Sequence, residues 1–110
     1  YRVERLLREA ADPGVAVILL DVVLGYGAHA DPASVLVPAI REAKAIADRD
    51  GRYLSVVASV CGTDEDPQCL SLQERRLAEA GVVLMSSNAA AARLAAAIAT
   101  REKALGKEER

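Results

Sequence analysis

The segment from residue 25 to residue 31 combines the residue types of a small anion-binding site. Its candidate ligand-binding members are Gly25, Tyr26, Gly27, Ala28 and Asp31. The two glycines let a ligand approach the backbone closely, because they carry no side chains. Asp31 and the proline after it are typical of a helix start, where unpaired amides and the helix dipole favour negative charge. The segment therefore predicts binding of phosphate or carboxylate, with the Asp31 carboxylate capping the helix; glycines needed only for turn geometry are the alternative.

Two further residues are candidates for catalysis. His29 is the only histidine of the chain, and its imidazole suits a phosphate partner, a proton donor or a phosphorylated nucleophile. An exposed loop histidine without such a role is the alternative. Asp21 interrupts an apolar run from residue 15 to residue 24, which costs free energy unless the carboxylate is hydrogen-bonded or lies near the sheet edge. Asp21 is thus either a carboxylate at the rim of a ligand site or a structural acceptor for loop amides.

A second loop, from residue 61 to residue 66, offers a glycine, a hydroxyl and three carboxylates. Its candidate binding residues are Gly62, Thr63 and Asp66. The carboxylates oppose binding of a bare phosphate without a cation, and helix capping is their alternative role. Cys69 is expected in the first turn of the next helix, where the dipole lowers a thiol pKa, but the sequence shows no base near it. Both Cys61 and Cys69 are therefore expected to be small buried residues, and no cysteine–histidine spacing indicates a metal site.

The elements that must position these loops alternate along the chain. The apolar run 15–24 has the length and β-branched content of a strand buried on both faces, which is typical of parallel sheets. The same unit then repeats. The expected order is helix 3–10, strand 15–24, helix 32–48, strand 53–60, helix 67–80, strand 82–85 and a last helix capped by residues 86–88 with Ala91, Leu94, Ala95 and Ile98 on its inner face, before a frayed charged tail at 101–110.

This alternation predicts an α/β fold with a three-layer parallel sheet of three strands, and a single domain over residues 1–110. The loops that follow the three strands then lie at the carboxyl ends of the strands, where open α/β sheets bind ligands. Three strands are fewer than the five usual in this class. We therefore expect the chain to be a fragment of a longer one. The missing strands are expected from the upstream portion of that chain or from another subunit, with a homo-oligomer as the expected assembly.

Composition and charge exclude several classes of function. The net charge is −2, and no basic stripe is present to neutralise phosphates, which argues against nucleic-acid binding. No apolar run approaches the roughly 20 residues that span a bilayer, and no secretory signal opens the chain. Two cysteines fit free thiols in a reducing compartment, so a cytoplasmic location is expected. The expected partner is a small anionic substrate.

One apolar segment resembles part of a signalling domain. The run from Ile18 to Leu24, with Asp21 at its centre, is similar to the strand that bears the phosphorylated aspartate of response-regulator receiver domains. Receivers also need an acidic pair on an earlier strand and a lysine after the last strand. This chain has no earlier strand, and Ser86 and Ser87 stand where the lysine is needed. Asp21 is accordingly not expected to accept phosphate, and a receiver module is only the third hypothesis.

A second set of motifs covers nearly the whole chain. The motifs are residues 19–28, Asp31-Pro32-Ala33, Cys61-Gly62-Thr63, Asp66-Pro67-Gln68-Cys69, and Ala80-Gly81 before Ser86-Ser87. Together they resemble the carboxy-terminal region of FdrA proteins, which are acyl-CoA synthetase-like relatives of succinyl-CoA synthetase. The resemblance implies a flavodoxin-like ligase domain of the succinyl-CoA synthetase type, with its earlier strands upstream.

The resemblance also implies a function. Members of the FdrA family are implicated in carbamoyl transfer between oxamate and carbamoyl phosphate during purine and allantoin breakdown. Residues 25–28 with Asp31 would form one wall of a phosphate or carboxylate site, and Gly62, Thr63 and Asp66 a second. No cofactor is expected in the 110 residues themselves, whereas the full-length protein would take CoA or carbamoyl phosphate. The isolated chain is expected to lack turnover, and a non-catalytic interaction domain that completes an enzyme assembly is the alternative.

Overall fold

The computed structural model describes the backbone of residues 3–108 and the side chains of residues 3–102. Helices and strands alternate as the sequence predicts. Their bounds are α1 (Val3–Ala11), β1 (Val17–Val23), α2 (Pro32–Arg49), β2 (Ser55–Cys61), α3 (Leu70–Glu79), β3 (Val82–Met85) and α4 (Asn88–Glu108). Within the described residues, no helix is both long and apolar enough to cross a membrane.

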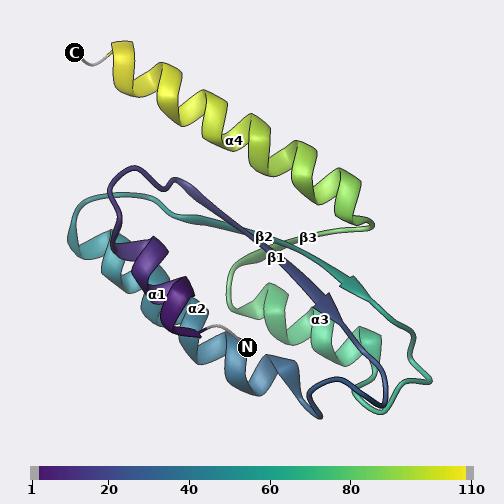
Figure 1. Cartoon of the computed structure of the whole chain (residues 1–110). Coiled ribbons are helices and arrows are strands. Elements are labelled where there is room, and N and C mark those ends of the chain that lie inside the picture. Colours follow the sequence, from purple (N-terminus) through teal and green to yellow (C-terminus); the bar gives the residue numbers. More distant parts are fainter. Residues whose placement is uncertain (1–2, 109–110) are drawn as a thin grey trace.

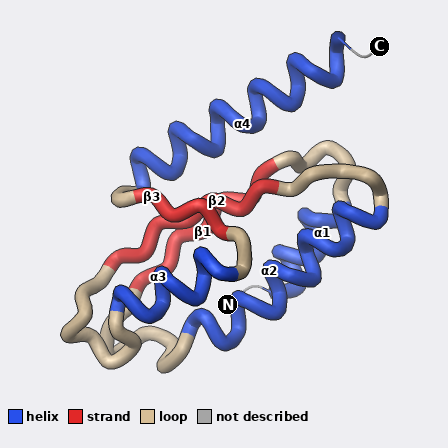
Figure 2. The backbone as a smooth tube through the Cα atoms, turned by 180° about the vertical axis from the view of Figure 1, so that it is seen from behind, coloured by secondary structure: helices blue, strands red, loops and turns tan. Residues whose placement is uncertain are grey.

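The three strands form one parallel sheet in the order β1-β2-β3. Helices α1, α2 and α3 cover one face of this sheet, and α4 alone lies across the other (Figure 1 and, from behind, Figure 2). The loops that follow β1 and β2 come together at one end of the sheet, at the carboxyl ends of the strands. The expected three-layer α/β fold is therefore confirmed.

The main core lies between the sheet and the helices α1–α3. It is built from aliphatic side chains, with Ile40 of α2 and Val22 of β1 among the largest that are fully buried. The central strand β2 is buried on both faces along most of its length. The prediction of two-sided burial is wrong for β1, where Leu19 and Val23 are 47% and 52% exposed. The reason is that β1 lies at the edge of the sheet, under a face that only α4 covers.

On the outer edge of β1, the backbone groups pair with no other strand among the described residues. The Leu24 amide donates to the Cys61 carbonyl at 2.8 Å, and the Ala16 carbonyl accepts from the Ser55 amide at 3.0 Å. In a parallel ladder, alternate residues of a strand pair with the same neighbour. The even-numbered residues of β1 therefore pair with β2, and the odd-numbered residues 17 to 23 direct their amides and carbonyls outward.

We expect this alternation to appear in amide hydrogen exchange. In the 110-residue chain at low concentration, the amides of Leu19 and Asp21 should exchange about 100-fold or more faster than those of Leu20 and Val22, because only the latter are held by β2. NMR-detected exchange measures this residue by residue. Repeating the measurement at tenfold higher concentration is the control for self-pairing of the edge. Equal protection of odd and even residues at low concentration would contradict the open edge.

Two helix boundaries differ from the sequence prediction. Helix α3 begins at Leu70 rather than at Pro67, because Pro67 lies in a separate turn that the Cys69 amide closes by donating to the Asp66 carbonyl at 2.9 Å. The last helix continues to Glu108, so the expected fraying from Arg101 is wrong over the described residues; residues 109–110 lie outside them. Arginine, glutamate, lysine, alanine and leucine after position 100 are all strong helix formers.

The expected end of α3 and the expected start of α4 are confirmed. Gly81 follows α3 with a φ of 90°, a conformation that side chains disfavour. The Ser87 hydroxyl accepts the Ala90 amide at 3.1 Å and caps α4. On the predicted inner face of α4, Ala91 and Ala95 are buried and Leu94 and Ile98 are half-buried. The second strand starts at Ser55 rather than at Tyr53, whose side chain is exposed.

Candidate functional site

The loop after β1 is held in place by hydrogen bonds to a glutamine from the loop after β2. Gln68 is only 4% exposed, and its side-chain amide nitrogen donates to the carbonyls of Gly25 at 2.7 Å and His29 at 2.9 Å. Its carbonyl oxygen accepts the Gly25 amide at 3.1 Å. Gly25 has a φ of 140°, which a residue with a side chain rarely adopts. The two predicted walls of the site are therefore joined by one buried side chain.

A second buried glutamine holds the start of α2. Gln73 of α3 is 2% exposed, and its Oε1 accepts the Ala33 amide at 2.9 Å. Its Nε2 donates to Asp31 Oδ1 at 3.1 Å and to the Gln68 carbonyl at 3.2 Å. Gln73 thus satisfies an amide of the first helical turn that would otherwise have no partner inside the helix.

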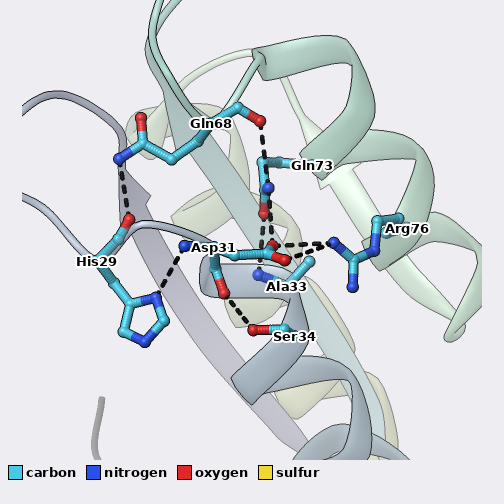
Figure 3. Close-up of polar contacts among 7 residues, drawn as sticks. All are labelled: His29, Asp31, Ala33, Ser34, Gln68, Gln73 and Arg76. Carbon is cyan, nitrogen blue, oxygen red and sulfur yellow. Dashed lines mark hydrogen bonds and ion pairs between the residues drawn. The ribbon is translucent and has the colours of Figure 1, made fainter.

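The expected capping role of the Asp31 side chain is wrong. No side-chain capping bond links Asp31 to α2; instead Arg76 of α3 donates from Nη1 to both carboxylate oxygens, at 2.9 and 3.0 Å (Figure 3). The Gln73 side chain accepts the Ala33 amide in place of the Asp31 side chain. The amide and hydroxyl of Ser34 both donate to the Asp31 carbonyl. The side-chain hydrogen bonds from Gln73 and Arg76 hold the pKa of Asp31 below its ordinary value of 3.8.

The carboxylates of the second loop serve local structure. Asp66 accepts the Thr63 amide, and Asp64 accepts both the amide and the hydroxyl of Ser71 at 2.7 Å, in the first turn of α3. These hydrogen bonds from Ser71 lower the pKa of Asp64. Gly62 has a different role, because a Cβ atom there would lie 2.7 Å from Leu24 Cβ. The capping alternative is therefore confirmed for Asp64, and Gly62 permits the two loops to approach.

The two catalytic candidates lie in different places. His29 belongs to the first loop, and its Nδ1 accepts the Asp31 amide at 2.9 Å, which leaves the ring proton of the neutral form on Nε2 (Figure 3). Asp21 is exposed on β1 and, by strand alternation, points to the α4 face, away from Gln73 and its partners. It is in register with Ser59, whose hydroxyl bonds to Asn88. The structure does not bring Asp21 and His29 together.

The cysteine expectations need correction. Cys61 is exposed at the end of β2, because it lies beyond the cover of α4. Cys69 is half-buried and precedes α3 rather than lying within its first turn, with a φ of 59° and its thiol 3.7 Å from Asp64 Oδ1. Among the described side chains, no group of three histidine, cysteine, aspartate or glutamate residues is placed to hold a metal ion.

Three residues that contact Asp31 or the first loop were not predicted as site residues: Gln68, Gln73 and Arg76. The sequence carries one signal for them. Gln73 stands three residues after Leu70 and four before Leu77, so that it occupies the apolar face of its helix. A polar residue there must find buried partners. Nothing comparable distinguishes Arg76 from an ordinary exposed arginine of a helix.

The first loop and Arg76 offer hydrogen-bond donors of the kind that small anions accept. No described residue accepts a hydrogen bond from the amides of Tyr26 and Gly27. Space around Gly27 is open, since an added Cβ there would meet no atom within 4 Å, and the Tyr26 side chain is exposed. Arg76 supplies a guanidinium group on the neighbouring helix. Backbone amides and a guanidinium are both donors suited to phosphate and carboxylate oxygens.

Comparison with known proteins gives two similarities. The family model described as CoA-ligase matches residues 1–98. The "Uncharacterized protein YahF" of Escherichia coli (strain K12) is 51% identical over 87 residues, which cover 79% of this chain. The match spans 17% of that relative's length.

Proposed function

Because the chain belongs to the CoA-ligase family, we propose that its loops contribute an anion-binding wall to an acyl-CoA synthetase-related enzyme. The observation that carries this proposal is the fastening of the first loop by Gln68, which leaves the amides of Tyr26 and Gly27 available at the carboxyl end of the sheet. Thr63 and Asp66 of the second loop lie in the turn beside it. A phosphoryl or carboxylate group is the ligand class that such amides accept.

The proposal extends to a carbamoyl-transferring enzyme of the FdrA type. Oxamate carries a carboxylate and carbamoyl phosphate carries a phosphate, so both present the oxyanion that this loop suits. CoA, with its phosphates, is the other ligand proposed for the whole protein. The described residues bring one imidazole, His29, and one guanidinium, Arg76, to this edge, whereas acyl and phosphoryl transfer need several convergent groups. The remaining groups are proposed to come from outside these 110 residues.

The partner proposed for β1 is a further parallel strand. Connections between parallel strands are right-handed in about 98% of cases. Helix α1 packs beside α2, on the same face of the sheet, so a strand joined to its amino end would fall on the open side of β1. An upstream part of a longer polypeptide, or another subunit, would provide that strand. The same open edge supports the second candidate function, a non-catalytic interaction domain that completes an assembly.

A titration followed by NMR tests the anion site. Phosphate, carbamoyl phosphate and oxamate should each shift the amide signals of Tyr26 and Gly27, with dissociation constants of about 1 mM or weaker, near −4 kcal/mol. Gly27→Val should abolish these shifts, because its side chain blocks the approach to the amides. His29→Ala should reduce them only modestly, since its Nδ1 already accepts the Asp31 amide.

Chloride at the same ionic strength is the control for non-specific effects. Loss of binding in His29→Ala with retention in Gly27→Val would show that the imidazole, and not the loop backbone, recognises the anion. Absence of any response to all three ligands would overturn the proposed wall.

A further inference from the structure

We propose that Arg76 and Gln73 form a second oxyanion subsite, which the Asp31 carboxylate occupies as an internal ligand. The proposal rests on the anion-binding function above and adds a specific receptor for it. A phosphate or carboxylate group of the substrate would replace Asp31 in this subsite. The two donor side chains come from α3, whereas Asp31 comes from the first loop (Figure 3).

The Asp31 carboxylate contacts both donor side chains of the proposed subsite. Arg76 Nη1 lies 2.9 and 3.0 Å from its two oxygens, and Gln73 Nε2 lies 3.1 Å from Oδ1. No described residue accepts from Nε or Nη2 of Arg76, so the guanidinium keeps donors for further oxygens. A guanidinium with a side-chain amide beside it is well suited to a planar carboxylate or to two oxygens of a phosphate.

The Gln73 part of the subsite stays in place when Asp31 leaves. Gln73 is 2% exposed and is held by two contacts that do not involve the carboxylate, the Ala33 amide at Oε1 and the Gln68 carbonyl at Nε2. Helix α2 also keeps its start, because Gln73 rather than the Asp31 side chain satisfies the Ala33 amide. Removal of the Asp31 carboxylate therefore empties the subsite without removing a helix cap.

Solvent and ligands can reach this pair. The side chains of Arg76 and Asp31 are 34% and 43% exposed. They lie beside the first loop, since Asp31 ends it and Gln73 contacts Gln68, which fastens it. An anion bound at the amides of Tyr26 and Gly27 and a second oxyanion at Arg76 would thus belong to one extended ligand.

The test measures phosphate and acetate binding to the 110-residue chain by NMR, at constant ionic strength. The signals followed are the side-chain amide of Gln73 and the Nε–H of Arg76. Asp31→Ala should bind phosphate at least about tenfold more tightly than the parent chain, because a tethered competitor at high effective concentration is gone. Asp48→Ala removes the same charge from an exposed position of α2 and should change the affinity less than twofold.

Three results would overturn the proposal: no gain in Asp31→Ala, an equal gain in Asp48→Ala, or a gain that persists when Arg76→Gln is added. A purely structural ion pair predicts the first of these. If Asp31→Ala does not fold, Asp31→Asn keeps the shape without the charge; it should show a smaller gain, and no gain would count against the subsite. The Gly27 amide reports the proposed loop site separately: a shift there without a response at Gln73 and Arg76 overturns only the subsite.

Discussion

Gln73→Leu should lower the free energy of unfolding by about 2–4 kcal/mol. The leucine side chain fits an apolar stripe, but it leaves the Ala33 amide and the Gln68 carbonyl without their partners. Each unsatisfied buried polar group costs about 1–3 kcal/mol. Urea unfolding monitored by circular dichroism measures the difference.

Arg75→Leu is the matched control, because it introduces the same side chain at an exposed position of the same helix. Its free energy of unfolding should stay within about 0.5 kcal/mol of the parent value. If Gln73→Leu is as stable as the parent chain, burial of the leucine offsets the lost hydrogen bonds, and the start of α2 does not depend on Gln73.

Gly62→Ala should destabilise the chain by about 1–3 kcal/mol through overpacking. The added Cβ would lie 2.7 Å from Leu24 Cβ and 2.9 Å from Asp66 Oδ2, both closer than van der Waals contact permits. The two loops must therefore separate. The largest changes of chemical shift should appear at Leu24 and Thr63, in addition to the loss measured by urea unfolding.

Gly27→Ala makes the same chemical change where an added Cβ meets no atom within 4 Å. Its stability should remain within about 0.5 kcal/mol of the parent chain. Equal losses in the two variants would mean that the backbone freedom of glycine, rather than the close approach of Leu24, explains the presence of Gly62.

The order of elements could be predicted because each one leaves a local pattern. The apolar runs identify the strands, and Asp31 with Pro32 marks the start of α2, as the structure confirms. From the sequence, the burial of β1 could not be distinguished from the burial of β2, since both segments are mostly apolar. Burial depends on where a strand lies in the sheet. In this sheet β1 lies at the edge and β2 at the centre.

The contacts of the site were harder to predict than the loops that contain it. An aspartate before a proline is typical of a helix cap, and the sequence around Asp31 gives no reason to expect another partner. Its actual partner, Arg76, stands 45 residues later on another helix. The packing of α3 against α2 decides this pairing, and that packing has no signature within either segment.

The glutamine contacts also set the order in which the site forms during folding. Gln68, Gln73 and Arg76 reach back across 39 to 45 residues to the first loop and the start of α2. Contacts of such separation are made only after the intervening chain has closed into a loop. On a ribosome, the first loop would have left the exit tunnel well before the residues that fix its shape. The conformation of the first loop is therefore among the last features to form. A polypeptide that ends before α3 would carry this loop without the contacts that shape it.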